Sequence, residues 1–280
     1  MRPARRRETR PARPLGTNRR DPVEHTLPWV VRELPPPGSP ALWLLRVSDV
    51  PTGILDEQVL DATERRRAAS LMRAADRNRF TAAHVALRRL LGSYLGLRPE
   101  DIHFGRDTCP CCGGPHGRPT VLGTDHELFF SLSHRGDLAL VGTAAAPIGV
   151  DVELVSDQDT TAELATMLHV DEQAELAALA PASRPRAMAR LWTRKEAYLK
   201  GLGTGLGRDP ALDYVGSGGP RGPYPPSGWT LLDVPVDRGY AAAIAVRGPL
   251  DVGGPTVNRL SVLDVVRHTW DAPLAVGKPP

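Results

Sequence analysis

The chain has 280 residues, of which 41% are hydrophobic and 24% charged, and its formal net charge at pH 7 is +3. This length and hydrophobic content suffice to bury one substantial core or two small ones, which excludes a fibrous protein. No apolar run is long enough to span a bilayer, and the N-terminus lacks the continuous apolar segment of a secretory signal. We therefore expect a cytoplasmic protein with no membrane partner.

The first 24 residues differ in composition from the rest of the chain. Eight arginines lie between Arg2 and Arg20, mixed with prolines. Such a segment has too little apolar surface to fold, so we predict a solvated, disordered tail over residues 1–24. A nucleic-acid-binding arm is the alternative, and we favour the flexible tail because most charged extensions are only solvated.

The next part of the chain is predicted to form a strand and two helices. Residues 41–47 are an apolar run typical of a buried strand, and residues 56–73 fit a helix with a basic stretch at 65–67. A second helix is expected to be capped by Asp76 and to end at Gly96.

The remaining elements are predicted from short apolar runs and turn residues. Strands are expected at 129–133, 138–143 and 148–154, with a hairpin turn at 134–137. Helices at 171–180 and 186–201 and hairpin strands at 229–234 and 240–246 then repeat the order of the first half.

This repeated order predicts an α+β protein with two similar halves related by pseudo-twofold symmetry. The N-terminal half is assigned to residues 25–146 and the C-terminal half to residues 147–250, with the active site in the cleft between them. The C-terminal extension, residues 251–280, receives no role.

Strand 148–154 carries two carboxylates on one face. Asp151 and Glu153 are two residues apart, so both point to one side of the strand, and Val150 and Val152 point to the other. Carboxylates at the end of a strand offer the hard oxygen ligands that magnesium prefers. A solvent-facing acidic edge is the alternative reading of Asp-x-Glu on its own.

Lysine is scarce in this chain, which makes its positions informative. Of 35 basic residues, only Lys195, Lys200 and Lys278 are lysine, and the first two lie in one predicted helix with Glu196. Residues four apart share a helix face, so Trp192, Glu196 and Lys200 line up. This pattern fits either an ordinary i to i+4 ion pair or a third metal ligand with ammonium groups for a metal-bound pyrophosphate.

A hydroxyl and an imidazole meet at the end of the predicted strand 129–133. Ser133 and His134 have the donors needed to bind a phosphate there. A histidine that only satisfies the turn is the alternative, and we interpret Arg135-Gly136-Asp137 as turn chemistry.

Together, these motifs resemble the signature of phosphopantetheinyl transferases of the surfactin-synthetase-activating type. Gly-Val-Asp-Val-Glu at 149–153 precedes Trp-Thr-Arg-Lys-Glu-Ala-Tyr-Leu-Lys at 192–200 by about forty residues. Residues 117–119, Gly-Arg-Pro, are similar to the family's Gly-Lys-Pro loop, and 130–137 to its Asn-x-Ser-His-Ser-Gly segment. The resemblance extends over residues 56–246, and the spaced pair of motifs is far more specific than either alone.

The resemblance implies an enzyme that moves the phosphopantetheine arm of coenzyme A onto a serine of an apo acyl or peptidyl carrier protein. Adenosine 3',5'-bisphosphate is the leaving group. By this resemblance, Asp151, Glu153 and Glu196 correspond to magnesium ligands, with Glu196 also our candidate general base. Lys195 and Lys200 would then lie near the pyrophosphate, with Lys200 neutralising the leaving group.

The resemblance also implies five contacts to coenzyme A, all in the N-terminal half. They are Arg67, Arg79, Arg118, Ser133 and His134. Arg118 stands where the family has lysine, Ser131 where it has asparagine, and Arg135 where a small residue is common. Each replacement retains polarity, which favours an active enzyme over an inactive, carrier-binding relative.

A separate cluster, Cys109-x-x-Cys112-x-x-x-His116, has a spacing compatible with structural zinc, with His103 or His126 as a fourth ligand. A Gly/Pro-rich loop leading to Arg118 is the alternative that we favour, because one Cys-x-x-Cys without a partner pair is a weak signal. A zinc- and nucleic-acid-binding module is the rival hypothesis for the whole chain, and it leaves the acidic motifs unexplained.

The resemblance also implies a carrier protein as partner. Carrier recognition surfaces are acidic in this family's substrates, which suits the basic stretch at 65–67. Since one chain contains every motif, we expect a monomer, and the sequence does not distinguish fatty-acid, polyketide and nonribosomal-peptide pathways.

Overall fold

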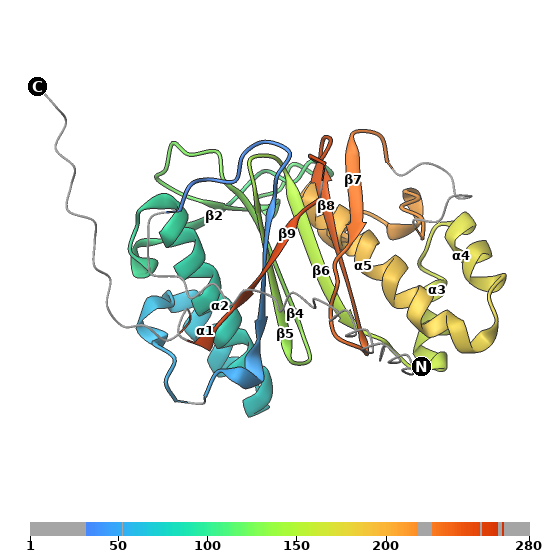
Figure 1. Ribbon diagram of the computed structural model, residues 1–280, viewed down its shortest axis with the longest axis horizontal. Coiled ribbons are helices and arrows are strands. Elements are labelled where there is room, and N and C mark those ends of the chain that lie inside the picture. Colours follow the sequence, from blue (N-terminus) through green and yellow to red (C-terminus); the bar gives the residue numbers. More distant parts are fainter. Residues whose placement is uncertain (1–31, 52, 218–225, 253, 263–264, 266–280) are drawn as a thin grey trace, which may run out of the picture.

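The computed structural model describes residues 32–51, 53–217, 226–252, 254–262 and 265. The tail predicted for residues 1–24 lies outside these residues, as does the end of the C-terminal extension. The described elements form a mixed α+β structure whose layers follow one another as helix, sheet, sheet and helix (Figure 1). No helix in this described part of the chain is long and apolar enough to cross a membrane.

The first sheet is built mainly from the N-terminal half. Its strand order is β4 (Phe129–Arg135), β5 (Leu138–Ala144), β1 (Ala41–Arg46) and β9 (Thr256–Leu260). The first three strands pair antiparallel, and β9 pairs parallel with β1. Strand β9 therefore returns the segment after residue 250, to which the sequence assigned no role, to the sheet of the first half.

Helices α1 (Ala62–Ser70) and α2 (Ala74–Leu95) lie beside this sheet (Figure 1). A buried apolar core joins α2 to the sheet, and within it the indole nitrogen of Trp43 donates to the hydroxyl of Tyr94 at 3.1 Å. Gly96 ends α2 with φ of 65°, as predicted, because the left-handed conformation favours glycine.

The single helix predicted over residues 56–73 is wrong in its extent. Asp56 caps only a short 3-10 turn, Glu57–Val59, and Leu60 is extended. Asp61 then starts α1 through a capping box, in which its side chain accepts from the amide of Glu64 and the Glu64 carboxylate accepts from the amide of Asp61. Two acidic caps in succession therefore divide the segment.

The second sheet belongs to the C-terminal half. Its strand order is β6 (Ile148–Leu154), β8 (Tyr240–Arg247) and β7 (Trp229–Asp233), all antiparallel. Helix α5 (Arg184–Leu202) packs on its outer face, with α4 (Val170–Ala177) and the unpredicted α3 (Gln158–Ala165) beyond it (Figure 1). The predicted strands and the long helix of this half are confirmed.

The two sheets enclose an apolar layer to which both contribute, including Leu42 and Leu140 from one and Val150, Val152 and Ile244 from the other. Strands β4 and β6 approach each other through side chains. The hydroxyl of Ser131 accepts from the amide of Val150 at 3.1 Å, and that of Ser133 accepts from the amide of Val152 at 3.3 Å. Serine hydroxyls thus bring β4 and β6 together.

A small two-stranded sheet, β2 (Phe104–Arg106) with β3 (Pro119–Val121), stands apart from the two large ones. The connection between its strands contains Cys109, Cys112 and His116. The sheet therefore fixes both ends of the cysteine-containing loop.

Candidate active site

Strand β6 positions the two acidic side chains of the first motif. Val150 and Val152 are fully buried in the layer between the sheets, so Asp151 and Glu153 point to the opposite face, as the alternation predicts. That face is covered by α5. Asp151 is almost completely buried, with 3% of its surface exposed, which excludes the reading of a solvent-facing acidic edge for this residue.

Two glycines allow α5 to lie directly against β6. A Cβ atom on Gly149 would clash with the carbonyl oxygen of Ala197 and would lie 2.5 Å from the amide nitrogen of Gly201. A Cβ atom on Gly201 would lie 2.6 Å from the ring of Trp229 and 3.3 Å from the amide nitrogen of Gly149. The backbones therefore touch at Gly149 and Gly201, and this contact brings the side chains of α5 to the carboxylates of β6.

Lys200 of α5 reaches the buried carboxylate. Its Nζ lies 2.6 Å from Oδ1 of Asp151 and 3.3 Å from the carbonyl oxygen of Val150. The hydroxyl of Ser133 donates to the same Oδ1 at 2.8 Å. The other oxygen, Oδ2 of Asp151, is buried and has no hydrogen-bond partner among the described residues.

Glu153 and Glu196 complete a cluster of three carboxylates. Burial raises the pKa of Glu196, and the negative charges of Asp151 and Glu153 raise it further. Burial and then the charge of Asp151 likewise raise the pKa of Glu153, although Arg135 lies 3.1 Å away and opposes the rise. Glu196 from α5 therefore lies close enough to both carboxylates of β6 to feel their charge.

This cluster fits a divalent cation. It provides hard oxygen ligands from three side chains, and Oδ2 of Asp151 is a buried acceptor that lacks a donor. Burial first, and the charge of Asp151 second, raise the pKa values of Glu153 and Glu196, and a bound cation would oppose both effects. The ligand oxygens of the three carboxylates do not all lie within 4.8 Å of one another. Among the described residues, only the group of Cys109, Cys112 and His116 meets that spacing.

A cleft of about 850 Å³ reaches Asp151 through two of its lining residues, Ser133 and Lys200, although Asp151, Glu153 and Glu196 are not themselves among the residues that line it. Both halves line it, because its walls include β4 of the first half and the C-terminal end of α5 in the second. Four of the predicted substrate contacts are among its lining residues: Arg118, Ser133, His134 and Lys200. The structure thus brings these four residues together next to the acidic cluster.

His134 is neutral at physiological pH in this environment. Burial lowers its pKa to about 4, and the positive charges of His84, Arg79 and Lys200 contribute to the decrease. Its Nδ1 atom is buried without a hydrogen-bond partner among the described residues. A phosphate beside His134 would supply both an acceptor and compensating negative charge.

The three arginines of the predicted site occupy different environments. Arg118 lines the cleft, where its guanidinium pairs with Asp107 at 3.1 Å and donates to the carbonyl of Gly201 at 3.2 Å. Arg79 lies near His134, pairs with Asp76 and donates to the carbonyl oxygen of Gly136 at 3.1 Å. Arg67 is exposed on α1 and is not among the residues that line the cleft.

Lys195 does not join the other predicted residues. Its side chain is fully buried and its Nζ pairs with the equally buried carboxylate of Glu172 at 2.8 Å, while also donating to the carbonyl oxygen of Asp213. Glu172 in turn accepts from the amides of Val215 and Gly216. As placed, Lys195 ties α5 to α4 and to the loop after α5, and its ammonium does not face the cleft.

The sequence did not single out an acidic and an imidazole side chain, Glu64 and His84, that line the cleft near His134. His84 stacks on Phe80 with ring centroids 4.0 Å apart, and its Nδ1 lies 2.8 Å from the carboxylate of Glu64. Beneath them, the fully buried Arg88 pairs with Glu64 at 2.6 Å. The sequence signal that could have identified His84 is its position four residues after Phe80, which places this polar side chain on the apolar face of α2.

Comparison with known proteins agrees with this geometry. Residues 147–217, which contain β6 and α5, match the model of the 4'-phosphopantetheinyl transferase superfamily. The similarity to this superfamily's model therefore lies in the part of the chain that contains β6 and α5.

Curated relatives extend the similarity beyond this domain. The 4'-phosphopantetheinyl transferase HetI of Nostoc sp. is 29% identical over 219 residues, which cover 74% of this chain and 87% of the relative. The phosphopantetheinyl transferase of Thraustochytrium sp. is 30% identical over 191 residues, covering 61% of this chain and 64% of the relative. The 4'-phosphopantetheinyl transferase AcpT of Salmonella typhimurium is 33% identical over 124 residues, or 44% of this chain and 59% of the relative.

Proposed function

We propose that this protein is a 4'-phosphopantetheinyl transferase, which transfers the phosphopantetheine moiety of coenzyme A to a serine hydroxyl of an apo carrier protein. The convergence of Asp151, Glu153 and Glu196 beside Lys200 is the observation that carries the proposal. The matched family model and the names of the relatives agree with it. The surfactin-synthetase-activating subtype is proposed from the two sequence motifs.

Asp151, Glu153 and Glu196 are the proposed ligands of a magnesium ion. Their all-oxygen donor set and the unpartnered Oδ2 of Asp151 support this assignment. When bound, magnesium neutralises charge on the pyrophosphate of coenzyme A and on the leaving phosphate. The raised pKa values of Glu153 and Glu196 mean that such a cation also stabilises their ionised forms.

The chain's own side chains account for the proton and the charge in the transfer. The carrier serine oxygen forms a bond to the phosphorus that bears the pantetheine arm, and the bond from that phosphorus to the oxygen of adenosine 3',5'-bisphosphate breaks. Glu196, as the ionised carboxylate contributed by α5, accepts the serine proton. Lys200 neutralises charge that develops on the leaving group.

Coenzyme A is proposed to occupy the cleft between the halves. Ser133 and His134 would contact its phosphates, Arg79 would add positive charge beside them, and Arg118 would border the adenosine portion. Lys195 is not assigned a contact with the pyrophosphate, because its buried ammonium pairs with the carboxylate of Glu172. Arg67 belongs to an exposed basic stretch on α1, which suits contact with an acidic carrier better than with a buried phosphate.

The two halves are proposed to be related by pseudo-twofold symmetry, with boundaries near residues 25–146 and 147–250. A helix packed on the outer face of each large sheet supports this relationship. A cytoplasmic monomer is the proposed working form, because one chain provides every side chain in the scheme.

The decisive experiment is incubation of the purified protein with coenzyme A, magnesium and an apo acyl or peptidyl carrier protein, followed by intact-mass measurement. We expect the carrier to gain the mass of one phosphopantetheine moiety. The gain should disappear with EDTA and return with excess magnesium. A folded protein that binds coenzyme A but modifies no apo carrier from any of the three pathways would contradict the proposal.

A further inference from the structure

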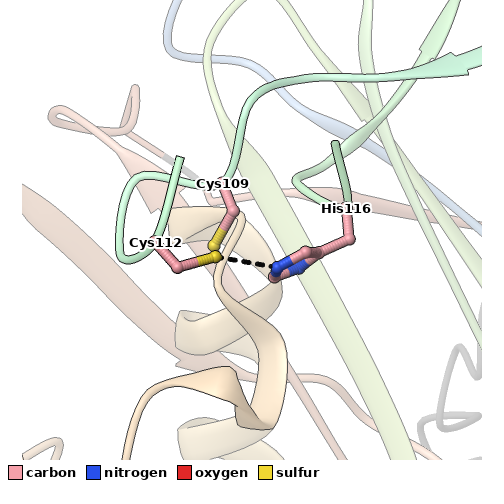
Figure 2. A group of neighbouring side chains, drawn as sticks. All are labelled: Cys109, Cys112 and His116. Atoms are coloured by element: carbon pink, nitrogen blue, oxygen red, sulfur yellow. Dashed lines mark hydrogen bonds between the residues drawn. The ribbon is translucent and has the colours of Figure 1, made fainter. Parts of the chain in front are cut away.

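The loop between β2 and β3 gathers two sulfurs and an imidazole apart from the cluster of three carboxylates. The ligand atoms of Cys109, Cys112 and His116 all lie within 4.8 Å of one another. Figure 2 shows the three side chains turned toward a common point, with Sγ of Cys112 2.9 Å from Nε2 of His116. Cys109 is buried, whereas Cys112 and His116 are exposed.

The backbone of this loop is folded into a compact turn that holds the sulfurs together. The amide of Cys109 donates to the carbonyl of Gly114 at 2.7 Å, and the amide of Gly113 donates to the carbonyl of Cys109 at 2.9 Å. Gly113 has φ of 73°, a conformation that favours glycine. A Cβ atom on Gly114 would lie 3.0 Å from the His116 ring, so glycine also leaves room for the imidazole.

The surroundings of Cys109 favour a thiolate sulfur. The backbone N–H groups of Cys111 and Cys112 donate to the Cys109 sulfur. Backbone donors aimed at a sulfur stabilise negative charge on it, as metal coordination requires. The compact turn and the gathered ligand atoms are two separate geometric features that both favour a bound metal ion.

We propose that Cys109, Cys112 and His116 bind one zinc ion, with the fourth position taken by solvent on the exposed side. Two thiolates and one imidazole are the ligand types that zinc prefers, and soft sulfur ligands disfavour magnesium. The fourth ligand suggested by the sequence, His103 or His126, is absent from the group that the described residues form. This zinc would be separate from the carboxylate cluster in both place and ligand chemistry.

The proposed zinc site is joined to the wall of the coenzyme A cleft. His116 and Arg118 both line the cleft, two residues apart. The amide of Gly117 donates to the carbonyl of Asp107 at 2.8 Å, and the Asp107 carboxylate pairs with Arg118. A metal ion that fixes His116 would therefore also fix the position of Arg118. The metal ion would then have a structural role, and it would affect the cleft through Arg118.

The test is the metal content of the full-length protein, purified without chelators and with reducing agent. We expect about one zinc per chain by elemental mass spectrometry. Cys112→Ser and His116→Asn should each lower zinc content at least about 10-fold. Cys111→Ser is the matched control, because Cys111 is a neighbouring exposed cysteine outside the proposed ligand set, and it should retain zinc.

Thermal unfolding provides a second readout that does not depend on transferase activity. Removing zinc with a chelator should lower the unfolding temperature of the wild-type protein and of Cys111→Ser, and adding zinc should restore it. The same treatment should leave Cys112→Ser unchanged. Any of three results would overturn the assignment. Folded wild-type protein could take up no zinc, Cys109 and Cys112 could form a disulfide even under reducing conditions, or Cys111→Ser could lose as much zinc as the ligand variants.

Discussion

The ammonium of Lys200 lies 2.6 Å from the buried carboxylate of Asp151, and these two residues come from different elements, α5 and β6. Their contact is the point at which the two sequence motifs meet. It places a positive charge beside the carboxylate cluster and at the edge of the cleft. The motif containing Lys200 thereby adjoins both the proposed metal ligands and the proposed coenzyme A phosphates.

Asp151→Asn is expected to lower the rate of phosphopantetheine transfer at least about 100-fold, because it removes the charge of a proposed metal ligand from a reaction that depends on charge stabilisation. The change is isosteric, so near-native thermal unfolding is expected. Initial rates measured by carrier mass, with increasing magnesium, check the prediction. The exposed Asp159 of α3 offers a matched control, and Asp159→Asn should keep the wild-type rate. Full activity in Asp151→Asn at ordinary magnesium concentration would contradict the role given to Asp151.

The two lysines of α5 should respond differently to the same substitution. Lys195→Met leaves the buried Glu172 without its charged partner, which should destabilise the fold by about 3–5 kcal/mol. Lys200→Met should instead lower the transfer rate about 100-fold with little change in stability, since Lys200 is partly exposed. Chemical denaturation and initial rates measured on both variants test the contrast. Equal loss of stability in both would show that their roles are not separated in this way.

Gly149→Ala should disturb the packing of α5 against β6. The added methyl group would clash with the carbonyl oxygen of Ala197, so the helix must shift, and overpacking of this kind costs about 1–3 kcal/mol. Glu196 and Lys200 would move with the helix, so activity should fall together with the unfolding temperature. Gly207→Ala is the control, because the nearest atom to its Cβ lies 4.0 Å away. Equal effects of the two substitutions would rule out the close contact as the cause.

The lowered pKa of His134 predicts that the stability of the protein depends on pH. This pKa is lowered from 6.5 to about 4 in the folded protein, so the unfolded chain binds more protons between these values. The free energy of unfolding should therefore decrease as pH falls from about 6.5 toward 4. His134→Gln should flatten this part of the profile, whereas His126→Gln, at an exposed position, should not. Denaturant titrations across this pH range provide the measurement, and an unchanged slope in His134→Gln would be the contrary result.

Local patterns were enough to predict much of this protein. Alternation in 148–154 correctly assigned Asp151 and Glu153 to one face, and apolar runs separated by turn residues identified both hairpins. The helix boundary at 56–73 failed because two successive acidic caps compete with helix periodicity. Strand β9 was not predicted because its place depends on pairing with β1, more than two hundred residues earlier in the chain.

The tertiary structure decided what each charged side chain faces. Lys195 and Lys200 are five residues apart, so they point about 140° apart around α5. The scarcity of lysine identified both as important, but only packing shows that one meets Glu172 and the other Asp151. The sequence by itself determined which side chains are available and which share an element. The close contact of Gly149 with Gly201 sets where α5 crosses β6 and so gives Lys200 its partner Asp151, whereas the packing of α4 against α5 gives Lys195 its partner Glu172.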